Sequence, residues 1–185
     1  LQDQGDYPRA VFVDLWGSAT MRTAGEEFAL ALHLLGVTPT WDHASDRVNG
    51  FEVIPLMTLG RPRVEATLRI SGLFRDVFPG LPALYDQAVK AVAARDEPDA
   101  DNPLAAKARS EAVAPHVFGP APASYGAGLN GVVGGNDFSD DARARAGEAW
   151  LAASAHAYGA GEATLARGAL ERQTAEADAF IHVQD

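Results

Sequence analysis

The sequence contains no cysteine and has fewer basic than acidic residues. Without cysteine, disulfide bonds, thiolate metal sites and a thiol nucleophile are excluded, and a reducing compartment is compatible with the composition. The chain has 15 Lys and Arg against 25 Asp and Glu, a formal net charge of −10. Nonspecific binding to nucleic acid or to an anionic membrane needs a basic surface, so both are disfavoured. A small anionic ligand is still compatible, because a few local arginines override a distant negative field.

Long hydrophobic runs are also absent. No apolar stretch approaches the length of a membrane-spanning helix, and the first residues lack the basic, apolar pattern of a secretory signal. We therefore expect a cytoplasmic protein without a membrane span. The chain opens at Leu1 and stops just as a strand-like run finishes, so we expect a segment excised from a longer protein.

What is present is the composition of a folded domain. The chain has 185 residues, of which 47% are hydrophobic and 22% charged, enough for one domain with a substantial core. Hydrophobic periodicity predicts strands and helices in alternation. We expect strands at 10–15, 37–41, 64–71 and 180–183, and helices at 23–35, 81–92, from 139 onward and at 162–176. This order predicts a layered, Rossmann-like α/β fold with a largely parallel sheet flanked by helices, as a single α/β domain or segment over residues 1–185.

Three local patterns carry sharper expectations. Thr23 and Glu26 have the spacing of a capping box, in which each side chain bonds a free amide at a helix start. The run 37–41 is expected to complete a β-α-β unit with the first strand. Apolar and polar residues alternate along 64–71, which places Arg69 on the polar face of a half-covered strand.

Several common catalytic and binding motifs are missing or incomplete. There is no Gly-x-Ser-x-Gly, and the five histidines show neither His-x-x-x-His nor His-Glu-x-x-His spacing, so we assign no metal ligands and find little support for hydrolase chemistry. Residues 126–131, GAGLNG, satisfy G-x-G-x-x-G. The preceding FGPAP is a poor strand and the acids that follow open a helix, so a tight loop is favoured over a nucleotide site.

The arginines are the remaining candidates. Arg22 follows the first strand, Arg69 lies near the end of the third, and Arg75 comes just beyond it. Ligands of α/β sheets usually bind outside the carboxyl ends of the strands, where these side chains would hold carboxylates. The alternative is a structural ion pair such as Arg75 with Asp76, or solvated charges.

Five stretches together carry a resemblance. They are WGSATMRTAGEE (16–27), GFEVIPLMTLGRPRVEATLRISG (50–72), TLRISGLFRDVFP (67–79), DEPDADNPLAAKAR (96–109) and FGPAPASYGAGL (118–129). In this order they resemble the large subunit of aerobic cobaltochelatase, in the family that also contains the large subunit of magnesium chelatase. The final HVQD resembles the opening of a further family motif of the type NQD-N-x-E-x-D. Members are several times longer than this chain, so the resemblance implies one internal segment.

The resemblance implies a tetrapyrrole-binding subunit that acts with AAA+ ATPase and accessory chelatase subunits. For the cobalt branch, it implies a metal–nitrogen bond-forming ligase that inserts Co²⁺ into hydrogenobyrinic acid a,c-diamide in cobalamin biosynthesis, with ATP and Mg²⁺ on the partner subunits. Arg69 and Ala127-Gly128 resemble the cobalt branch more than the magnesium branch. The alternatives are a segment of a magnesium chelatase H-type protein and a non-catalytic docking domain that contacts the ATPase subunits through the acidic loop 96–101. The isolated segment is expected to be inactive.

The resemblance also gives the candidate residues a context. Asp76 or Glu26 is expected to accept a proton or to hold the metal transiently, against the competing ion pair and capping box. The expected substrate-binding residues are Trp16, Arg22, Arg69, Ser71, Phe74, Arg75 and Tyr125, with Trp16 or Phe74 against the macrocycle face.

Overall fold

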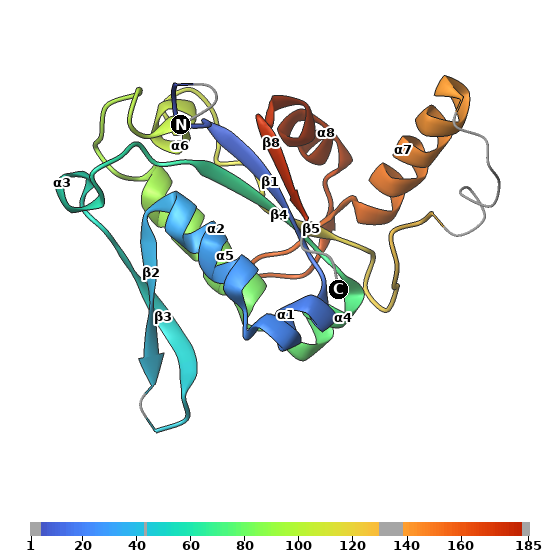
Figure 1. Cartoon of the computed structure of the whole chain (residues 1–185), viewed down its shortest axis with the longest axis horizontal. Helices are drawn as coiled ribbons and strands as arrows, with labels where there is room; N and C mark the ends of the chain where they lie inside the picture. Colours follow the sequence, from blue (N-terminus) through green and yellow to red (C-terminus); the bar gives the residue numbers. More distant parts are fainter. Residues whose placement is uncertain (1–4, 43, 130–138, 183–185) are drawn as a thin grey trace.

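The computed structural model describes residues 5–42, 44–129 and 139–182. Its centre is a six-stranded sheet in the order β7-β6-β5-β4-β1-β8 (Figure 1). Strands β8, β1, β4 and β5 are parallel, and β6 and β7 continue the sheet antiparallel. The predicted layered α/β fold with a largely parallel sheet is confirmed. The strand bounds are β1 Ala10–Leu15, β4 Glu65–Ile70, β5 Val117–Gly119, β6 His156–Ala157, β7 Thr164–Leu165 and β8 Ala179–His182.

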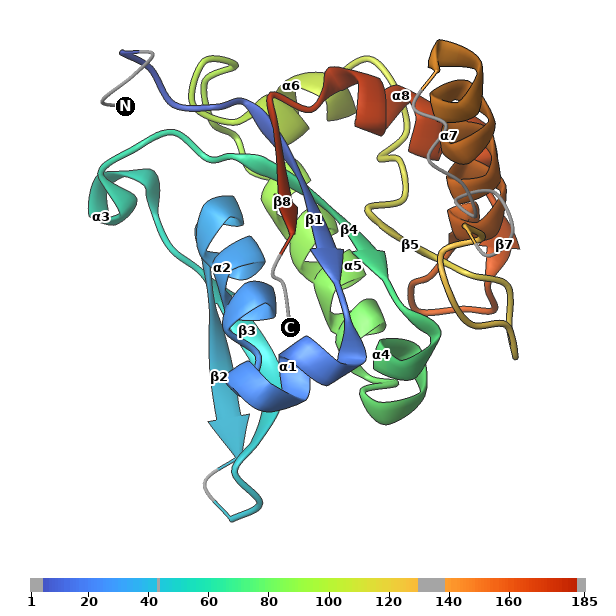
Figure 2. The ribbon, with the colours of Figure 1, turned by 45° about the vertical axis from the view of Figure 1, so that its right-hand side comes forward.

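Helices cover both faces of this sheet (Figure 2). On one face, the apolar side chains of β1 and β4 pack against helices α2 and α5, and on the other Phe12 and Phe118 pack with Leu170 of α8 and with α7. All six residues of β4 are therefore buried, and the expectation of a half-covered strand is wrong. The helix bounds are α1 Gly17–Thr23, α2 Glu26–Leu35, α4 Gly72–Val77, α5 Leu81–Ala93, α6 Pro103–Ala108, α7 Asp140–Ser154 and α8 Arg167–Glu176.

The run after α2 does not join the central sheet. Strand β2 (Val37–Asp42) instead pairs antiparallel with β3 (Arg47–Val53), and the short helix α3 (Leu56–Leu59) leads back to β4. This hairpin extends away from the body of the molecule (Figure 1). The expected β-α-β unit is wrong at this point, because Pro39 lacks the N–H that an interior strand needs and finds a place in a two-stranded ribbon.

Helix boundaries follow the sequence signals with two differences. Gly36 ends α2 with φ 74°, and the Ser139 hydroxyl accepts from Ala142 N at the start of α7, as predicted. The capping box is wrong: Thr23 ends α1, Gly25 caps α2 without a side chain, and Thr23 Oγ1 donates to Glu27 Oε2 at 2.8 Å. Helix α8 begins later than expected, because β7 uses the residues just before it.

Within the described ranges, no helix combines the length and the apolar character needed to cross a bilayer.

Candidate functional site

The carboxyl ends of the parallel strands meet at one edge of the sheet. Residues 14–22 run from the end of β1 into α1, residues 69–76 run from the end of β4 into α4, residues 120–129 follow β5, and His182 ends β8. We call this set the carboxyl edge. Parallel strands bring their carboxyl ends together, so the edge gathers polar side chains that are far apart in the sequence.

Ser71 joins two of these segments. Its hydroxyl accepts from Phe74 N at 3.1 Å, which caps α4, and from Gly17 N at 3.0 Å, which lies at the start of α1. Gly17 permits this approach, because a Cβ there would lie 2.7 Å from both Leu73 Cγ and Phe74 N. Ser71 was expected to bind substrate, but it is buried. Its two hydrogen bonds fix α1 and α4 against each other.

Arg69 is fully buried at the centre of the carboxyl edge. Its Nη1 donates to Asp14 Oδ1 at 3.2 Å, its Nη2 to the Gly126 carbonyl at 3.1 Å, and its Nε to Ser154 Oγ at 3.4 Å. The guanidinium carbon also lies 5.1 Å from the centre of the Trp16 ring, a cation–π distance. In this structure Arg69 is not open to a ligand; it holds the indole and the glycine loop in place.

Asp14 is the counter-charge of this arginine. It is only 8% exposed, and its Oδ2 accepts from Trp16 Nε1 at 2.9 Å and lies 3.2 Å from His182 Nδ1. Neither Asp14 nor His182 was predicted from the sequence. Asp14 could have been found from the sequence, since it is the lone carboxylate in the apolar run 10–15. A charged side chain buried in such a run needs hydrogen-bonding or ionic partners. His182 carried no comparable signal, since only the β1–β8 register brings it opposite Asp14.

Arg75, Asp76 and Tyr125 form a second network, nearer the surface. Arg75 donates to both Asp76 carboxylate oxygens at 2.6 and 3.1 Å and to the carbonyls of Ala121 and Ser124. The Tyr125 hydroxyl donates to Asp76 Oδ2 at 2.5 Å, and its ring lies under the Arg75 guanidinium at 5.5 Å. Hydrogen bonds from Arg75 and then Tyr125 lower the pKa of Asp76, so this carboxylate is a weak proton acceptor.

The other predicted residues are more scattered. Phe74 is fully buried, with its ring centre 5.3 Å from that of Phe78 and 6.3 Å from that of Phe28, so it does not present a face to a ligand here. Arg22 lies exposed in the last turn of α1, and Glu26 is the exposed first residue of α2. Trp16 is half-buried and Tyr125 is 66% exposed, so these two aromatic side chains reach the surface of the carboxyl edge.

The glycine loop has a structural explanation. Gly126 and Gly128 have φ of 85° and 73°, which favour glycine, and a Cβ on Gly128 would lie 2.6 Å from the Ala149 carbonyl of α7. The loop thus packs against a helix, and the interpretation as a tight loop accounts for both residues. Asn130 and Gly131 lie outside the described residues.

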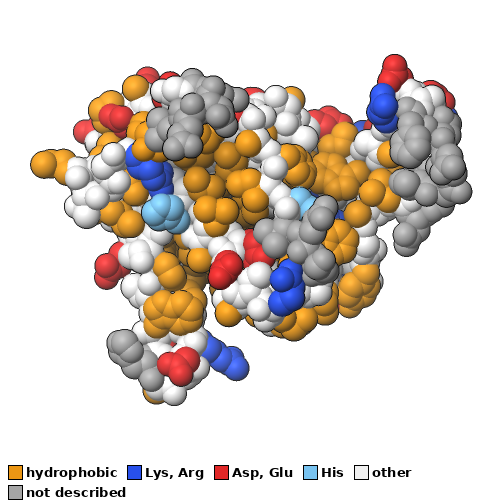
Figure 3. Space-filling view, in the orientation of Figure 1, with side chains coloured by type: hydrophobic (Ala, Val, Ile, Leu, Met, Phe, Trp, Pro, Cys, Tyr) orange, Lys and Arg blue, Asp and Glu red, His pale blue; other side chains and the backbone are white. Residues whose placement is uncertain are grey.

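An apolar groove of about 410 Å³ lies between the hairpin and the helices α1 and α2. Figure 3 shows hydrophobic side chains along the hairpin and over the neighbouring helices. Trp41 is 53% exposed and Met21 52% exposed in its wall. The groove is lined by Thr20, Met21, Ala24, Gly25, Phe28, Ala29, Leu32, Pro39, Trp41, Val48, Phe78 and Leu81.

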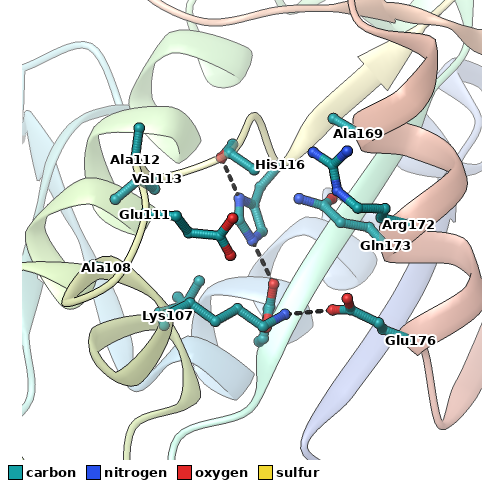
Figure 4. A pocket seen from close by; sticks show the side chains of 13 residues that line it. Lys107, Ala108, Glu111, Ala112, Val113, His116, Ala169, Arg172, Gln173 and Glu176 are labelled. Atoms are coloured by element: carbon teal, nitrogen blue, oxygen red, sulfur yellow. Dashed lines mark hydrogen bonds and ion pairs between the residues drawn. The ribbon is translucent and has the colours of Figure 1, made fainter.

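A charged cluster lies at the opposite end of the central strands, where these strands begin (Figure 4). Glu65, at the start of β4, bonds His116 Nε2 at 2.9 Å and Lys107 Nζ at 2.8 Å, and Lys107 also bonds Glu176 at 2.6 Å. Burial opposes ionisation of Glu65, but the hydrogen bonds from His116 and Lys107 outweigh it, so the pKa of Glu65 is lowered. The small cavity beside the cluster measures about 40 Å³, and the cluster clamps α6 and α8 to the sheet.

The acidic loop 96–101 is partly neutralised by internal partners. Glu97 is buried against Arg63, with Nε to Oε2 at 2.7 Å, and Asp99 is paired with Arg109. This pairing leaves less free negative charge for a basic partner than the sequence suggests. In the part of the chain that the structure describes, no three His, Asp or Glu side chains converge on a possible metal position.

Comparisons with known proteins agree on one family. The CobN/Magnesium Chelatase family model matches residues 1–185. The aerobic cobaltochelatase protein CobN of Sinorhizobium sp is 43% identical over 202 residues, covering 100% of this chain and 16% of that protein. The chloroplastic magnesium-chelatase protein ChlH of Oryza sativa subsp. japonica is 36% identical over 146 residues, covering 74% of this chain and 10% of that protein.

A solved structure gives the same result. The catalytic subunit of cobaltochelatase from Mycobacterium tuberculosis superimposes with a TM-score of 0.90 at 36% identity, and the match covers 100% of this chain and 16% of that one. The chain therefore spans about a sixth of the length of the cobaltochelatase subunits it matches.

Proposed function

The chain belongs to the CobN/magnesium chelatase family, and we propose that it forms a tetrapyrrole-facing part of the large subunit of a cytoplasmic cobaltochelatase. In this proposal the whole subunit inserts Co²⁺ into hydrogenobyrinic acid a,c-diamide during cobalamin biosynthesis, while AAA+ partner subunits hydrolyse ATP. The higher identity to the cobalt enzyme, 43% against 36%, favours Co²⁺ over Mg²⁺ as the metal.

The observation that carries the proposal is the convergence of Trp16 and the Tyr125 loop at the carboxyl edge. Arg69 stacks on Trp16 and bonds the carbonyl of Gly126, the residue after Tyr125, so one buried side chain fixes both. Aromatic faces suit the flat, apolar body of a macrocycle. The fixed geometry means that little side-chain entropy is lost when a ligand binds.

Positive charge at the same edge suits the acidic periphery of the macrocycle. Arg22 is exposed on α1, and Arg75 lies between the Tyr125 ring and the loop carbonyls. Guanidinium groups bind carboxylates through two parallel hydrogen bonds. We assign Arg22 to direct contact with substrate carboxylates, and Arg75, which is paired with Asp76, to holding the Tyr125 loop.

The proposal is tested by titrating hydrogenobyrinic acid a,c-diamide with the full-length large subunit and following its visible absorbance. Arg75→Ala should weaken binding about tenfold, the loss expected when about 1.4 kcal/mol of loop anchoring is removed. Arg95→Ala is the matched control, since Arg95 is a half-exposed, ion-paired arginine in the turn after α5. Equal affinities of wild type and Arg75→Ala would contradict the proposed site.

A second candidate role is docking, and the apolar groove favours it. Trp41 is exposed on a hairpin that extends from the body, and two-stranded hairpins are marginally stable alone. In this candidate role an ATPase subunit buries this surface. Trp41→Ala should then impair assembly, measured by co-elution with the ATPase subunits, and leave tetrapyrrole binding intact.

A further inference from the structure

His182 and Asp14 form an imidazole–carboxylate pair at the carboxyl edge. The register of β8 on β1 places the two residues opposite each other, with His182 Nδ1 3.2 Å from Asp14 Oδ2. Asp14 is 8% exposed, whereas the His182 side chain is 43% exposed. One partner is therefore buried and fixed, and the other reaches solvent at the edge proposed to face the tetrapyrrole.

The surroundings of Asp14 determine which ring nitrogen is free. The Asp14 carboxylate accepts from Arg69 Nη1 at 3.2 Å through Oδ1 and from Trp16 Nε1 at 2.9 Å through Oδ2, so both of its oxygens act as hydrogen-bond acceptors. An ionised carboxylate has no proton to donate, so His182 Nδ1 must carry the hydrogen of their bond. In the neutral imidazole, Nε2 then holds the lone pair.

We propose that His182 is the proton acceptor of the metal-insertion step, an inference that rests on the proposed function. The corrin ring of hydrogenobyrinic acid a,c-diamide carries one inner N–H, so when Co²⁺ binds the four ring nitrogens this N–H bond breaks and its electron pair stays on nitrogen to bind the metal. His182 Nε2 takes this proton, becomes an imidazolium balanced by Asp14, and then releases the proton to water. No oxidant or reductant is required.

The other acceptor candidates fit this role less well. Asp76 is closed into the network with Arg75 and Tyr125, which lowers its pKa. Glu26 is an exposed residue in the first turn of α2, where its charge complements the positive end of the helix. His182 is a base oriented by a buried carboxylate, which in turn is held by a buried arginine.

The decisive variant is His182→Asn in the full-length large subunit, assayed with its ATPase partners, Co²⁺ and hydrogenobyrinic acid a,c-diamide. The asparagine amide nitrogen lies near the position of Nδ1, so it keeps the bond to Asp14 and removes Nε2. Insertion should slow about 100-fold, the usual contribution of a general base, while absorbance titration shows an affinity within about twofold of wild type. His33→Asn, on the exposed side of α2, is the matched control and should change neither.

If His182 only holds β8 against β1 and is not a base, the rescue experiment gives a different result. His182→Gly supplemented with free imidazole should recover part of the insertion rate, because the small base enters the vacated position. An unchanged rate in His182→Asn, or a loss in both variants without imidazole rescue, would overturn the inference even with tetrapyrrole binding intact. Failure of the wild-type protein to bind the tetrapyrrole would instead reject the proposed function, and the inference with it.

Discussion

Arg69 illustrates how a single residue changes meaning between sequence and structure. Its position near the end of a strand was predictable from the alternation along 64–71, but its burial was not. Whether a polar face of a strand meets water or a second layer of helices depends on α7 and α8, which come much later in the chain. Residue-level patterns therefore identified a charged side chain near the end of a strand, and only the structure shows that it is buried against Asp14.

Removal of this buried charge should be costly. Arg69→Met leaves Asp14 buried without its main counter-charge, and we expect a loss of about 3–5 kcal/mol in the free energy of unfolding. Equilibrium urea unfolding of the 185-residue chain measures it. Arg95→Met removes a half-exposed arginine that lies 3.5 Å from Glu97, whose carboxylate keeps Arg63 as its closer partner, so the expected cost is less than about 1 kcal/mol. A loss of similar size in both variants would show that the Asp14–Arg69 pair has no special role.

The lowered pKa of Glu65 predicts that the free energy of unfolding decreases in acid. Its pKa is lowered in the folded state, so its contribution is present above the unfolded pKa of about 4.3 and is lost as pH falls through the folded value. Glu65→Gln should therefore reduce stability at neutral pH and flatten the decline below about pH 5. Urea midpoints measured across the range from acid to neutral pH would reveal this. Parallel curves for the variant and the wild type would contradict the assignment.

The elements were predictable where local chemistry decides them. The stripe of apolar residues in α5, the Gly36 stop of α2 and the Ser139 cap of α7 all appear in the structure as expected. The hairpin was not predicted. Strand β2 pairs with β3 and not with the central sheet, and the residues of a strand do not by themselves indicate which other strand it will pair with. The start of α2 was also missed, because a second helix, α1, occupies the residues read as a cap.

The junction of α1 and α4 gives a prediction about two packed elements. Gly17→Ala places a Cβ 2.7 Å from Phe74 N, so the two helices must separate, at an expected cost of about 1–3 kcal/mol. Gly147→Ala is the matched control, since a Cβ there meets nothing within 4 Å inside α7. It should stabilise the helix by about 0.5–1 kcal/mol. Thermal unfolding followed by circular dichroism compares the two, and stabilisation by Gly17→Ala would refute the close approach.

In the molecule taken together, the sequence and the fold lead to the same family by different routes. The motifs at 16–27, 67–79 and 118–129 lie on three different strand–loop junctions, and the parallel sheet brings them to one edge. The order of these motifs along the chain is evident from the sequence. Their proximity in space could not be predicted, because it depends on the order of the strands in the sheet. The pairing of Asp14 with His182 has the same origin: it exists only because β8 lies beside β1.

The carboxyl edge and the apolar groove can be compared in one titration. Hydrogenobyrinic acid a,c-diamide is titrated with the full-length large subunit carrying Arg75→Ala or Trp41→Ala. If the carboxyl edge faces the macrocycle, Arg75→Ala weakens the saturable absorbance change about tenfold, equivalent to about 1.4 kcal/mol, and Trp41→Ala leaves it unchanged. Weakened binding in Trp41→Ala with wild-type affinity in Arg75→Ala would contradict this placement and move the tetrapyrrole to the groove.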